Sequence, residues 1–236
     1  AHRRLAIVDL SDSAAQPMRD GDLYLTFNGE IYNHAELRRE LIGLGIVDWQ
    51  TDHSDTEVIL KAYRAWGIDC IHRFRGMFAF ALWDGAHRTL WLVRDRLGIK
   101  PLYYAEHAGR LLFASEIKAL LQDRTLPRAI DEEALFHYLS FLTTPAPMTL
   151  FAGIRKLPAG CRMRVDARGT QHIERYWDAM TAAAEVGYVA PQERQEAVLS
   201  ALREAVRLRK LSDVNVGVFL SGGVDSSTNA ALFSEG

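Results

Sequence analysis

Two neighbouring apolar segments constrain the fold of this chain more than any other feature. Residues 77–84 (MFAFALWD) and 89–95 (TLWLVRD) are joined by a short connection that begins at Asp84-Gly85, a pattern typical of an antiparallel hairpin. Both strands are too apolar to face water, so other layers must cover them. A second hairpin is predicted from residues 101–105 and 110–116. The first half of the chain therefore predicts an α+β fold in layers of helix and sheet.

Short sequence patterns predict further elements around these hairpins. Residues 54–57 (SDTE) have the form of a capping box, and Asp131 is expected to cap the helix that follows it. Prolines predict an extended loop over 143–160. Asp95 is expected to have a mainly structural role in a turn shaped by Gly98. The remaining predicted strands are 5–10, 23–28, 161–166 and 170–177, and the predicted helices are 34–45, 55–67, 115–121 and 132–142.

The pattern changes after an alanine-rich segment, 179–191, which we expect to be a linker. Residues 193–211 have apolar side chains on one side of a helix, and residues 214–220 (VNVGVFL) have the β-branched composition of a strand. A glycine-rich turn then leads into another helix. Helix, strand and helix in this order are typical of a parallel sheet. We therefore predict one domain over 1–178 and the start of a second over 192–236.

Composition excludes several classes of partner. The 236 residues include 28 basic and 30 acidic side chains, so there is no general positive field for nucleic acid or for an anionic membrane. No apolar run approaches the roughly 20 residues that span a bilayer. Cys70 and Cys161 have the spacing of neither a metal site nor a disulfide framework, which favours a reducing cytoplasm. A small-molecule partner is therefore expected.

The glycine-rich turn at residues 221–227 (SGGVDSS) is predicted to bind phosphate. Its glycines allow the backbone to approach an anion closely, and the N–H groups of the helix start and the serine hydroxyls can donate to it. The turn lacks the lysine of a Walker motif, so it is not an ordinary P-loop. The alternative is a Gly-Gly turn whose serines only cap the helix, which the preceding strand pattern disfavours.

Residues 27–34 (FNGEIYNH) end an apolar strand and lead into a helix. Asn28 and Gly29 both tolerate positive φ, and this pair is common in tight turns. Taken without further context the pair favours a simple turn. Such a turn does not require the carboxylate of Glu30, which is the unusual residue here.

Several motifs occur in the order in which one enzyme family carries them. From residue 2 to residue 227 the chain closely resembles glutamine-hydrolysing asparagine synthetases of the bacterial B type. The last motif resembles the pyrophosphate-binding loop of N-type ATP pyrophosphatases, whereas RDRLGIKPLYY also occurs in glutaminase domains of other synthases. The motifs are HRRLAIVD, FNGEIYNH, SDTEVIL, GMFAFALWD, RDRLGIKPLYY, ASEIKAL and FLSGGVDSS.

The resemblance implies a type 2 glutamine amidotransferase domain over 1–178, with the αββα layers of an N-terminal-nucleophile glutaminase. It implies a linker over 179–191 and the start of an α/β ATP-pyrophosphatase-type domain over 192–236. In this family the first domain frees ammonia from glutamine, and the second uses ATP to activate aspartate as β-aspartyl-AMP, which ammonia attacks. A homodimer of the parent protein is an open alternative.

The resemblance also implies roles at a glutamine site. The Asn28 side chain and the Gly29 N–H match an oxyanion hole, which donates to the amide oxygen that becomes negative during attack. Arg4 matches the arginine that binds the α-carboxylate in a bidentate contact. Glu30 and Asp55 match acidic partners of the α-ammonium group, although Asp55 taken alone only complements a helix dipole. The matching residues are Arg4, Ile7, Val8, Asn28, Gly29, Glu30 and Asp55, with Ile7 and Val8 contributing their backbone.

In the second domain the resemblance implies that ATP binds at the glycine-rich turn. Leu220 matches a residue beside the adenine nucleotide, and the turn matches the pyrophosphate cradle. Asp225 is the candidate for a contact with Mg²⁺, which neutralises ATP phosphates, and its alternative role is that of a plain helix-start residue. The matching residues are Leu220, Ser221, Gly222, Gly223, Asp225 and Ser226.

The family's nucleophile is a cysteine at the mature N-terminus, whose own α-amine serves as the base. The sequence begins with Ala1, and the internal Cys70 and Cys161 have no free amine. We therefore expect a piece of a longer enzyme that is inactive and prone to aggregation when isolated. Two alternatives stay open, a paralogous amidotransferase that acts on another carboxylate and a non-catalytic glutamine-binding module.

Overall fold

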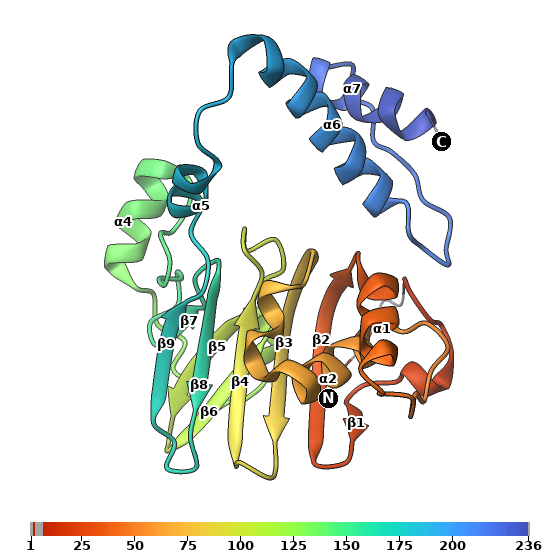
Figure 1. The fold of residues 1–236 in the computed structure, drawn as a ribbon. Helices are drawn as coiled ribbons and strands as arrows, with labels where there is room; N and C mark the ends of the chain where they lie inside the picture. Colours follow the sequence, from red (N-terminus) through yellow and green to blue (C-terminus); the bar gives the residue numbers. More distant parts are fainter. Residues whose placement is uncertain (1, 3–6, 236) are drawn as a thin grey trace. The chain divides into compact units, whose positions relative to one another are not determined.

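The structure, a computed structural model, describes residue 2 and residues 7–235, which form two compact units. The first unit is built from Gln16–Gly29 and Gly76–Asp178 and contains most of the β-structure (Figure 1). The second is built from Glu30–Arg75 together with the described residues from Ile7 to Ala15 and from Ala179 onward, and it is mainly helical. Within the described part of the chain, no helix is long and apolar enough to cross a membrane.

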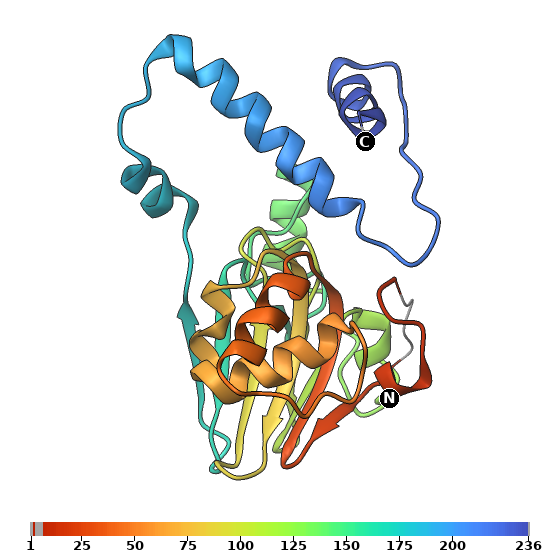
Figure 2. The same ribbon diagram turned by 45° about the vertical axis from the view of Figure 1, so that its right-hand side comes forward.

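Two antiparallel sheets form the first unit (Figure 1 and Figure 2). The larger sheet has the order β1 (Met18–Asp20), β2 (Leu23–Ile31), β3 (Gly76–Asp84), β4 (Thr89–Arg94), β8 (Cys161–Val165) and β9 (Gln171–Arg175). The smaller sheet has the order β6 (Arg110–Ala114), β5 (Tyr103–His107) and β7 (Ile154–Lys156). The three predicted hairpins, β3 with β4, β5 with β6 and β8 with β9, are confirmed.

Strand β3 is buried on both faces, as its composition predicts. On one face Ala79 and Ala81 join a core cluster with residues of the smaller sheet, so the two sheets share an apolar interior. On the other face Phe78 and Phe80 are buried with their ring centroids 6.0 Å apart. Burying one large apolar side chain contributes roughly 1.5–3 kcal/mol, which makes β3 a major source of stability. The cluster comprises Ala79, Ala81, Leu92, Leu102, Tyr104, Leu157, Cys161, Met163 and Val165.

The first unit also contains two predicted helices and one strand that the sequence did not predict. Helices α3 (Ile117–Leu120) and α4 (Glu132–Phe141) form as predicted, and the Asp131 carboxylate caps α4 by accepting from the Ala134 N–H at 2.9 Å. The predicted extended loop over 143–160 instead includes β7, which pairs with β5. A strand of three residues is too short to show a periodic pattern.

The second unit contains the remaining helices. Those predicted over 34–45, 55–67 and 193–211 are confirmed, and the segment expected as a linker contains α5, consistent with the high helix propensity of alanine. Helices α1 and α2 contact each other, as do α6 and α7. The elements are η1 (Asp12–Ala14), α1 (His34–Gly43), α2 (Asp55–Trp66), η2 (Gly67–His72), α5 (Ala179–Val186), α6 (Pro191–Arg209) and α7 (Val224–Ser234).

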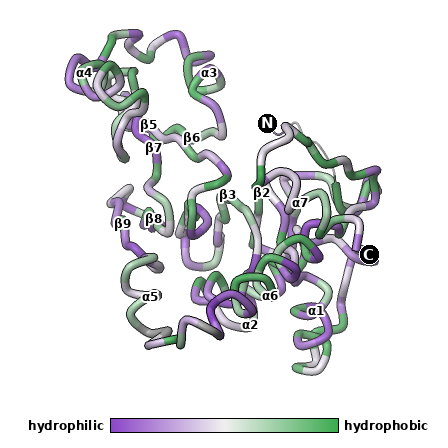
Figure 3. Tube along the Cα trace, turned by 90° about the horizontal axis from the view of Figure 1, so that it is seen from above, coloured by the Kyte–Doolittle hydropathy of each residue, from purple (hydrophilic) through white to green (hydrophobic). Residues whose placement is uncertain are grey.

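Helix α6 is amphipathic, and Figure 3 shows apolar and polar stretches along it. Its apolar side is only partly covered, because Leu208 is buried while Val198 and Leu202 stay exposed. Arg203 of α6 pairs with Glu235 beyond α7 at 2.9 Å, an exposed ion pair that contributes little stability.

The capping box predicted at the start of α2 does not form. Ser54 occupies the N-cap position, but its side chain makes no capping hydrogen bond. The Glu57 carboxylate instead accepts from the Gln50 N–H at 2.7 Å and from the Thr51 N–H and hydroxyl at 2.8 and 2.6 Å. Glu57 therefore fixes the loop before the helix. The donors of that loop occupy the carboxylate that a capping box would direct to the N–H of the N-cap residue, so the box is absent.

Two further predictions from the sequence are wrong in the described residues. Residues 7–10, the described part of the strand expected at 5–10, form a bend in which Asp9 has a φ of 55°. Residues 214–220 form no strand either, and Val214, Val216 and Val218 are exposed. A β-branched pattern favours a strand only where a neighbouring strand and a buried face support it, so the local pattern was insufficient.

A single buried carboxylate joins β3 to the turn that follows β4. Asp95 is 1% exposed, and its oxygens accept hydrogen bonds from the Phe78 N–H and from three N–H groups of residues 97–100, at 3.0–3.1 Å. Gly98 in this turn has a φ of 65°, a conformation that glycine adopts readily. The structural role predicted for Asp95 is confirmed.

The Asp95→Ala substitution should lower the free energy of unfolding by about 3 kcal/mol or more, because four N–H groups lose a charged acceptor. Asp166→Ala is the matched control, since Asp166 accepts from the N–H groups of Arg168 and Thr170 in the exposed turn between β8 and β9. We expect a much smaller effect there. Urea denaturation followed by circular dichroism measures both, and equal losses would contradict this role of Asp95.

Strand β2 approaches β3 so closely at Gly29 that only glycine fits. Gly29 has a φ of 148°, which L side chains rarely adopt. A Cβ built on it would overlap the Met77 carbonyl oxygen and lie 2.7 Å from the Phe78 Cα. Because the obstructing atoms belong to the backbone, no change of rotamer can relieve the overlap. The packing of the sheet therefore requires glycine at this position.

The Gly29→Ala substitution should destabilise the protein by roughly 3 kcal/mol or more, since it combines an overpacked contact with an unfavourable φ. Gly169→Ala separates the two effects, because Gly169 has a φ of 83° and a Cβ there would meet no atom within 4 Å. That control should lose only about 1–2 kcal/mol. Thermal denaturation compares the variants, and a Gly29 variant no less stable than the control would show that the strands can separate.

Candidate functional site

Asn28, Gly29 and Glu30 lie in strand β2 and not in a turn. The simple turn that these residues favour without further context is therefore a wrong prediction. The strand continues to Ile31, and α1 begins at His34. The close fit of Gly29 against β3 keeps this segment in the sheet. A glycine inside a strand often marks a place where another backbone or a ligand approaches closely.

The Asn28 side chain is oriented by a residue far along the chain. Its Nδ2 donates to the Ser115 Oγ at 3.3 Å, over a separation of 87 residues. Because a side-chain amide has two N–H groups, this bond uses one of them and fixes the direction of the other. Asn28 and the backbone of Gly29 thus supply the type of donors that a developing oxyanion needs. Sequence reasoning missed Ser115, since nothing local relates it to Asn28.

Two carboxylates of the second unit, Glu30 and Asp55, are almost fully buried, at 8% and 2% exposure. Asp55 is the first residue of α2, and its Oδ2 accepts from the Ile31 N–H at 3.1 Å. Asp55 therefore links α2 to the end of β2, in addition to complementing the helix dipole. A carboxylate is also the type of group that pairs with an ammonium ion, so both residues have the charge that the predicted contact requires.

The segment predicted to bind the α-carboxylate is described only in part. Arg4 lies outside the described residues, so its predicted contact is not placed. Val8 is buried, and the Ile7 carbonyl accepts from the Asp213 N–H at 2.9 Å. The backbone of Ile7 is thus bonded to the C-terminal part of the chain, a contact that the sequence did not indicate.

The glycine-rich turn before α7 is exposed and held by its own serines. The Ser226 Oγ accepts from the Ser221 N–H at 3.3 Å and donates to the Gly223 carbonyl at 3.1 Å, and the two serine Oγ atoms are 3.0 Å apart. Gly222 has a φ of 84°. Gly223 is the N-cap residue of α7 and provides no side-chain cap, so the N–H groups of the first turn can face an anion.

The described side chains do not form a metal site by themselves. Among residue 2 and residues 7–235, no group of three or more His, Cys, Asp and Glu residues could hold a metal ion. Asp225 lies in the first turn of α7, and Leu220 is exposed just before the glycine-rich turn. An Mg²⁺ ion at Asp225 would need phosphate oxygens as further ligands, so this assignment stays a prediction.

Neither cysteine has the environment of a nucleophile. Cys70 lies in η2 and Cys161 begins β8, and both are buried. Burial raises the pKa of the Cys161 thiol above its ordinary value. A thiol with a raised pKa is mostly protonated near neutral pH and reacts slowly.

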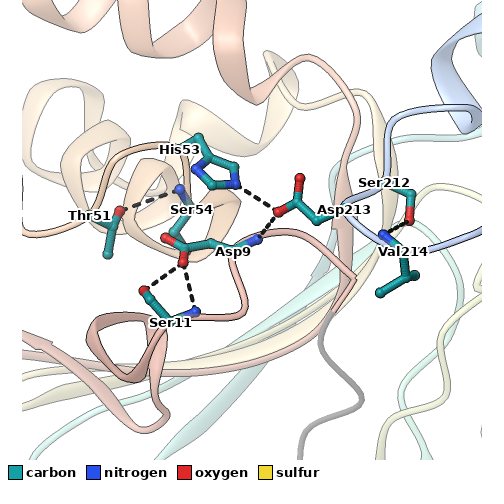
Figure 4. Close-up of polar contacts among 8 residues, drawn as sticks. All are labelled: Asp9, Ser11, Thr51, His53, Ser54, Ser212, Asp213 and Val214. Carbon is teal, nitrogen blue, oxygen red and sulfur yellow. Dashed lines mark hydrogen bonds and ion pairs between the residues drawn. The ribbon is translucent and has the colours of Figure 1, made fainter.

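Sequence reasoning also missed a polar cluster around Asp213 (Figure 4). The His53 Nε2 lies 2.7 Å from the Asp213 Oδ2, which also accepts from the Asp9 N–H at 2.8 Å. The Asp9 carboxylate in turn accepts from the N–H and hydroxyl of Ser11 at 3.0 and 2.6 Å. His53 and Asp213 are 160 residues apart, and no spacing in the sequence indicates a contact over that separation.

Comparison with known families assigns both parts of the chain. Residues 1–177 match the family model described as glutamine amidotransferase domain, and residues 197–235 match the one described as asparagine synthase. The putative glutamine-hydrolysing asparagine synthetase of Mycobacterium tuberculosis is 43% identical, over 97% of this chain and 36% of its own length. Glutamine-hydrolysing asparagine synthetase 1 of Bacillus subtilis is 39% identical, over 99% of this chain and 36% of its own length. The chain thus spans little more than a third of these relatives.

A solved structure shows the fold independently. The structure of the allosteric regulatory enzyme of purine biosynthesis superposes with a TM-score of 0.53 and 19% identity, covering 75% of this chain and 34% of that one. The predicted α+β fold of the N-terminal-nucleophile glutaminases is thereby confirmed. Because the first family model matches most of the chain, this protein belongs to the glutamine amidotransferase domain family.

Proposed function

We propose that this chain is the glutamine-binding region of an asparagine synthetase, joined to the first segment of its ATP-dependent synthase region. The observation that carries the proposal is the order of two family matches on one chain, with glutamine amidotransferase over 1–177 and asparagine synthase over 197–235. Relatives that match nearly the whole chain are named as asparagine synthetases, which supports aspartate as the acceptor.

For the amidotransferase part, we propose that Asn28 and Gly29 polarise the glutamine amide. The Asn28 amide is oriented by Ser115, and the Gly29 backbone is fixed against β3. Donors that are fixed before the reaction stabilise a developing negative oxygen without a cost of reorganisation. Cys70 and Cys161 are buried, so neither is proposed to attack the amide.

The amino-acid end of glutamine is proposed to be held by charge. Glu30 and Asp55 supply buried negative charge for the α-ammonium group, and Arg4 supplies a bidentate partner for the α-carboxylate. Such a site would bind an amino acid, which carries both an ammonium and a carboxylate group, in preference to a simple amide, which carries neither. This recognition is consistent with the burial of both carboxylates, Glu30 in β2 and Asp55 at the start of α2, since charged side chains are rarely buried without a partner.

For the synthase part, we propose that the glycine-rich turn binds ATP through its phosphates. The unblocked start of α7, Gly222 with its positive φ, and the hydroxyls of Ser221 and Ser226 fit an anion. Bound ATP would supply the leaving group that activates a carboxylate, and Mg²⁺ beside Asp225 would neutralise the phosphates.

Glutamine binding should separate two adjacent arginines. Arg4→Ala removes a bidentate contact with a carboxylate, so the dissociation constant for L-glutamine should rise about 10- to 100-fold. Arg3→Ala is the matched control, because it removes the same charge one residue away while the family match assigns the carboxylate contact to Arg4 alone, so it should leave the constant unchanged. Isothermal titration calorimetry with the purified chain measures both. Undetectable glutamine binding by the wild-type chain, or an equal loss in both variants, would refute the proposed site.

A further inference from the structure

We propose that Asp213 is a positioning residue for the glutamine site, because its carboxylate holds together two segments that flank predicted glutamine ligands. One segment is 7–9 and the other begins at His53. The part of the proposal that concerns glutamine rests on the proposed function. The contact itself stands on the geometry alone, so the two can be tested separately.

Asp213 makes three contacts with these segments. Its N–H donates to the Ile7 carbonyl at 2.9 Å. Its Oδ2 accepts from the Asp9 N–H at 2.8 Å (Figure 4). The same Oδ2 lies 2.7 Å from the His53 Nε2. The peptide N–H and the carboxylate of Asp213 thus bind the backbone on both sides of Val8. The carboxylate also links this backbone to His53 in the loop before α2.

These contacts matter because of what lies beside them in the sequence. Val8 is one residue before Asp9, and Asp55 is two residues after His53. Asp9 has a φ of 55°, a conformation that is unfavourable for a non-glycine residue and persists only when its surroundings hold it. Loss of the Asp213 carboxylate removes one of the bonds that hold it. The backbone of Ile7 and Val8, which the family match places at the glutamine site, would then be held less firmly.

Helix α6 supports the same arrangement from another side. The Arg209 guanidinium lies 5.1 Å from the centroid of the Tyr32 ring, two residues after Glu30. Glu204 lies 3.8 Å from Arg75, a weaker and exposed pair. Residues 204–213 belong to the region that matches asparagine synthase, whereas their partners belong to the amidotransferase region. Asp213 therefore connects the region that matches asparagine synthase to segments beside the proposed glutamine site.

The charges make the contact depend on pH. The hydrogen bond between His53 and Asp213 is the main reason that the pKa of His53 is raised. The same bond lowers the pKa of Asp213. Asp9 and Asp52 also face His53 electrostatically, as does His34, whose pKa is lowered mainly by burial. The ionic contact is complete below the ordinary histidine pKa of 6.5 and is lost as the pH rises through the raised value. On the acid side it is lost as the pH falls through the lowered pKa of Asp213.

The test uses the whole chain and three variants. Asp213→Ala removes the acceptor, Asp213→Asn keeps an acceptor without the charge, and Asp52→Asn removes a nearby charge without removing the contact. NMR titration gives the pKa of His53, hydrogen exchange gives the protection of the Asp9 N–H, and calorimetry at pH 6.0 and 7.5 gives the affinity for L-glutamine. Asp213 is 40% exposed, so the variants should fold, which circular dichroism verifies.

In Asp213→Ala we expect the pKa of His53 to fall, the Asp9 N–H to exchange at least about tenfold faster, and glutamine to bind roughly 5- to 20-fold more weakly at pH 6.0. Asp213→Asn should recover part of the affinity and bind with little dependence on pH between 6.0 and 7.5. Asp52→Asn should bind glutamine like the wild type.

The outcomes separate the two proposals. Faster exchange at Asp9 with unchanged glutamine affinity would overturn the positioning role while leaving the contact in place. Unchanged exchange and unchanged pKa of His53 in Asp213→Ala would overturn the contact as well. If the wild-type chain bound no glutamine, the proposed function would fail, and with it the role of Asp213 at that site, whatever the NMR measurements showed.

Discussion

The close backbone contact between β2 and β3 at Gly29 is the constraint on which the first unit depends. Gly29 packs against Met77 and Phe78, and the Phe78 N–H is bonded to the Asp95 carboxylate. The same carboxylate organises the turn after β4, so one buried charge supports the strand against which Gly29 lies. A sheet held in this way presents the Gly29 peptide in one orientation only, which is the property that a fixed hydrogen-bond donor requires.

Regular local patterns made much of this fold predictable. The apolar hairpins, the helices at 34–45 and 193–211 and the Asp131 cap all follow from the spacing of side chains along a few residues. Local sequence failed where the outcome depended on distant partners. Residues 214–220 have the composition of a strand but form none, and 28–30 have the composition of a turn but lie in a strand because β3 is beside them.

The candidate site shows the same limit. Asn28, Glu30 and Asp55 were found through motifs, and the structure adds the burial of both carboxylates and the bond from Asp55 to Ile31. Ser115 and Asp213 were not found, because each acts on a residue dozens to hundreds of positions away. A motif identifies groups that would touch a ligand, whereas the groups that orient them are specified by the tertiary fold.

The location of residues 28–30 within β2 also limits how such a protein can change over generations. Exposed turns accept extra residues easily, but an insertion in a strand shifts its register and turns every following side chain to the opposite face. Glycine at position 29 is further restricted by the backbone beside it. Related proteins should therefore differ in length at exposed turns outside β2, while residues 28–30 keep their spacing.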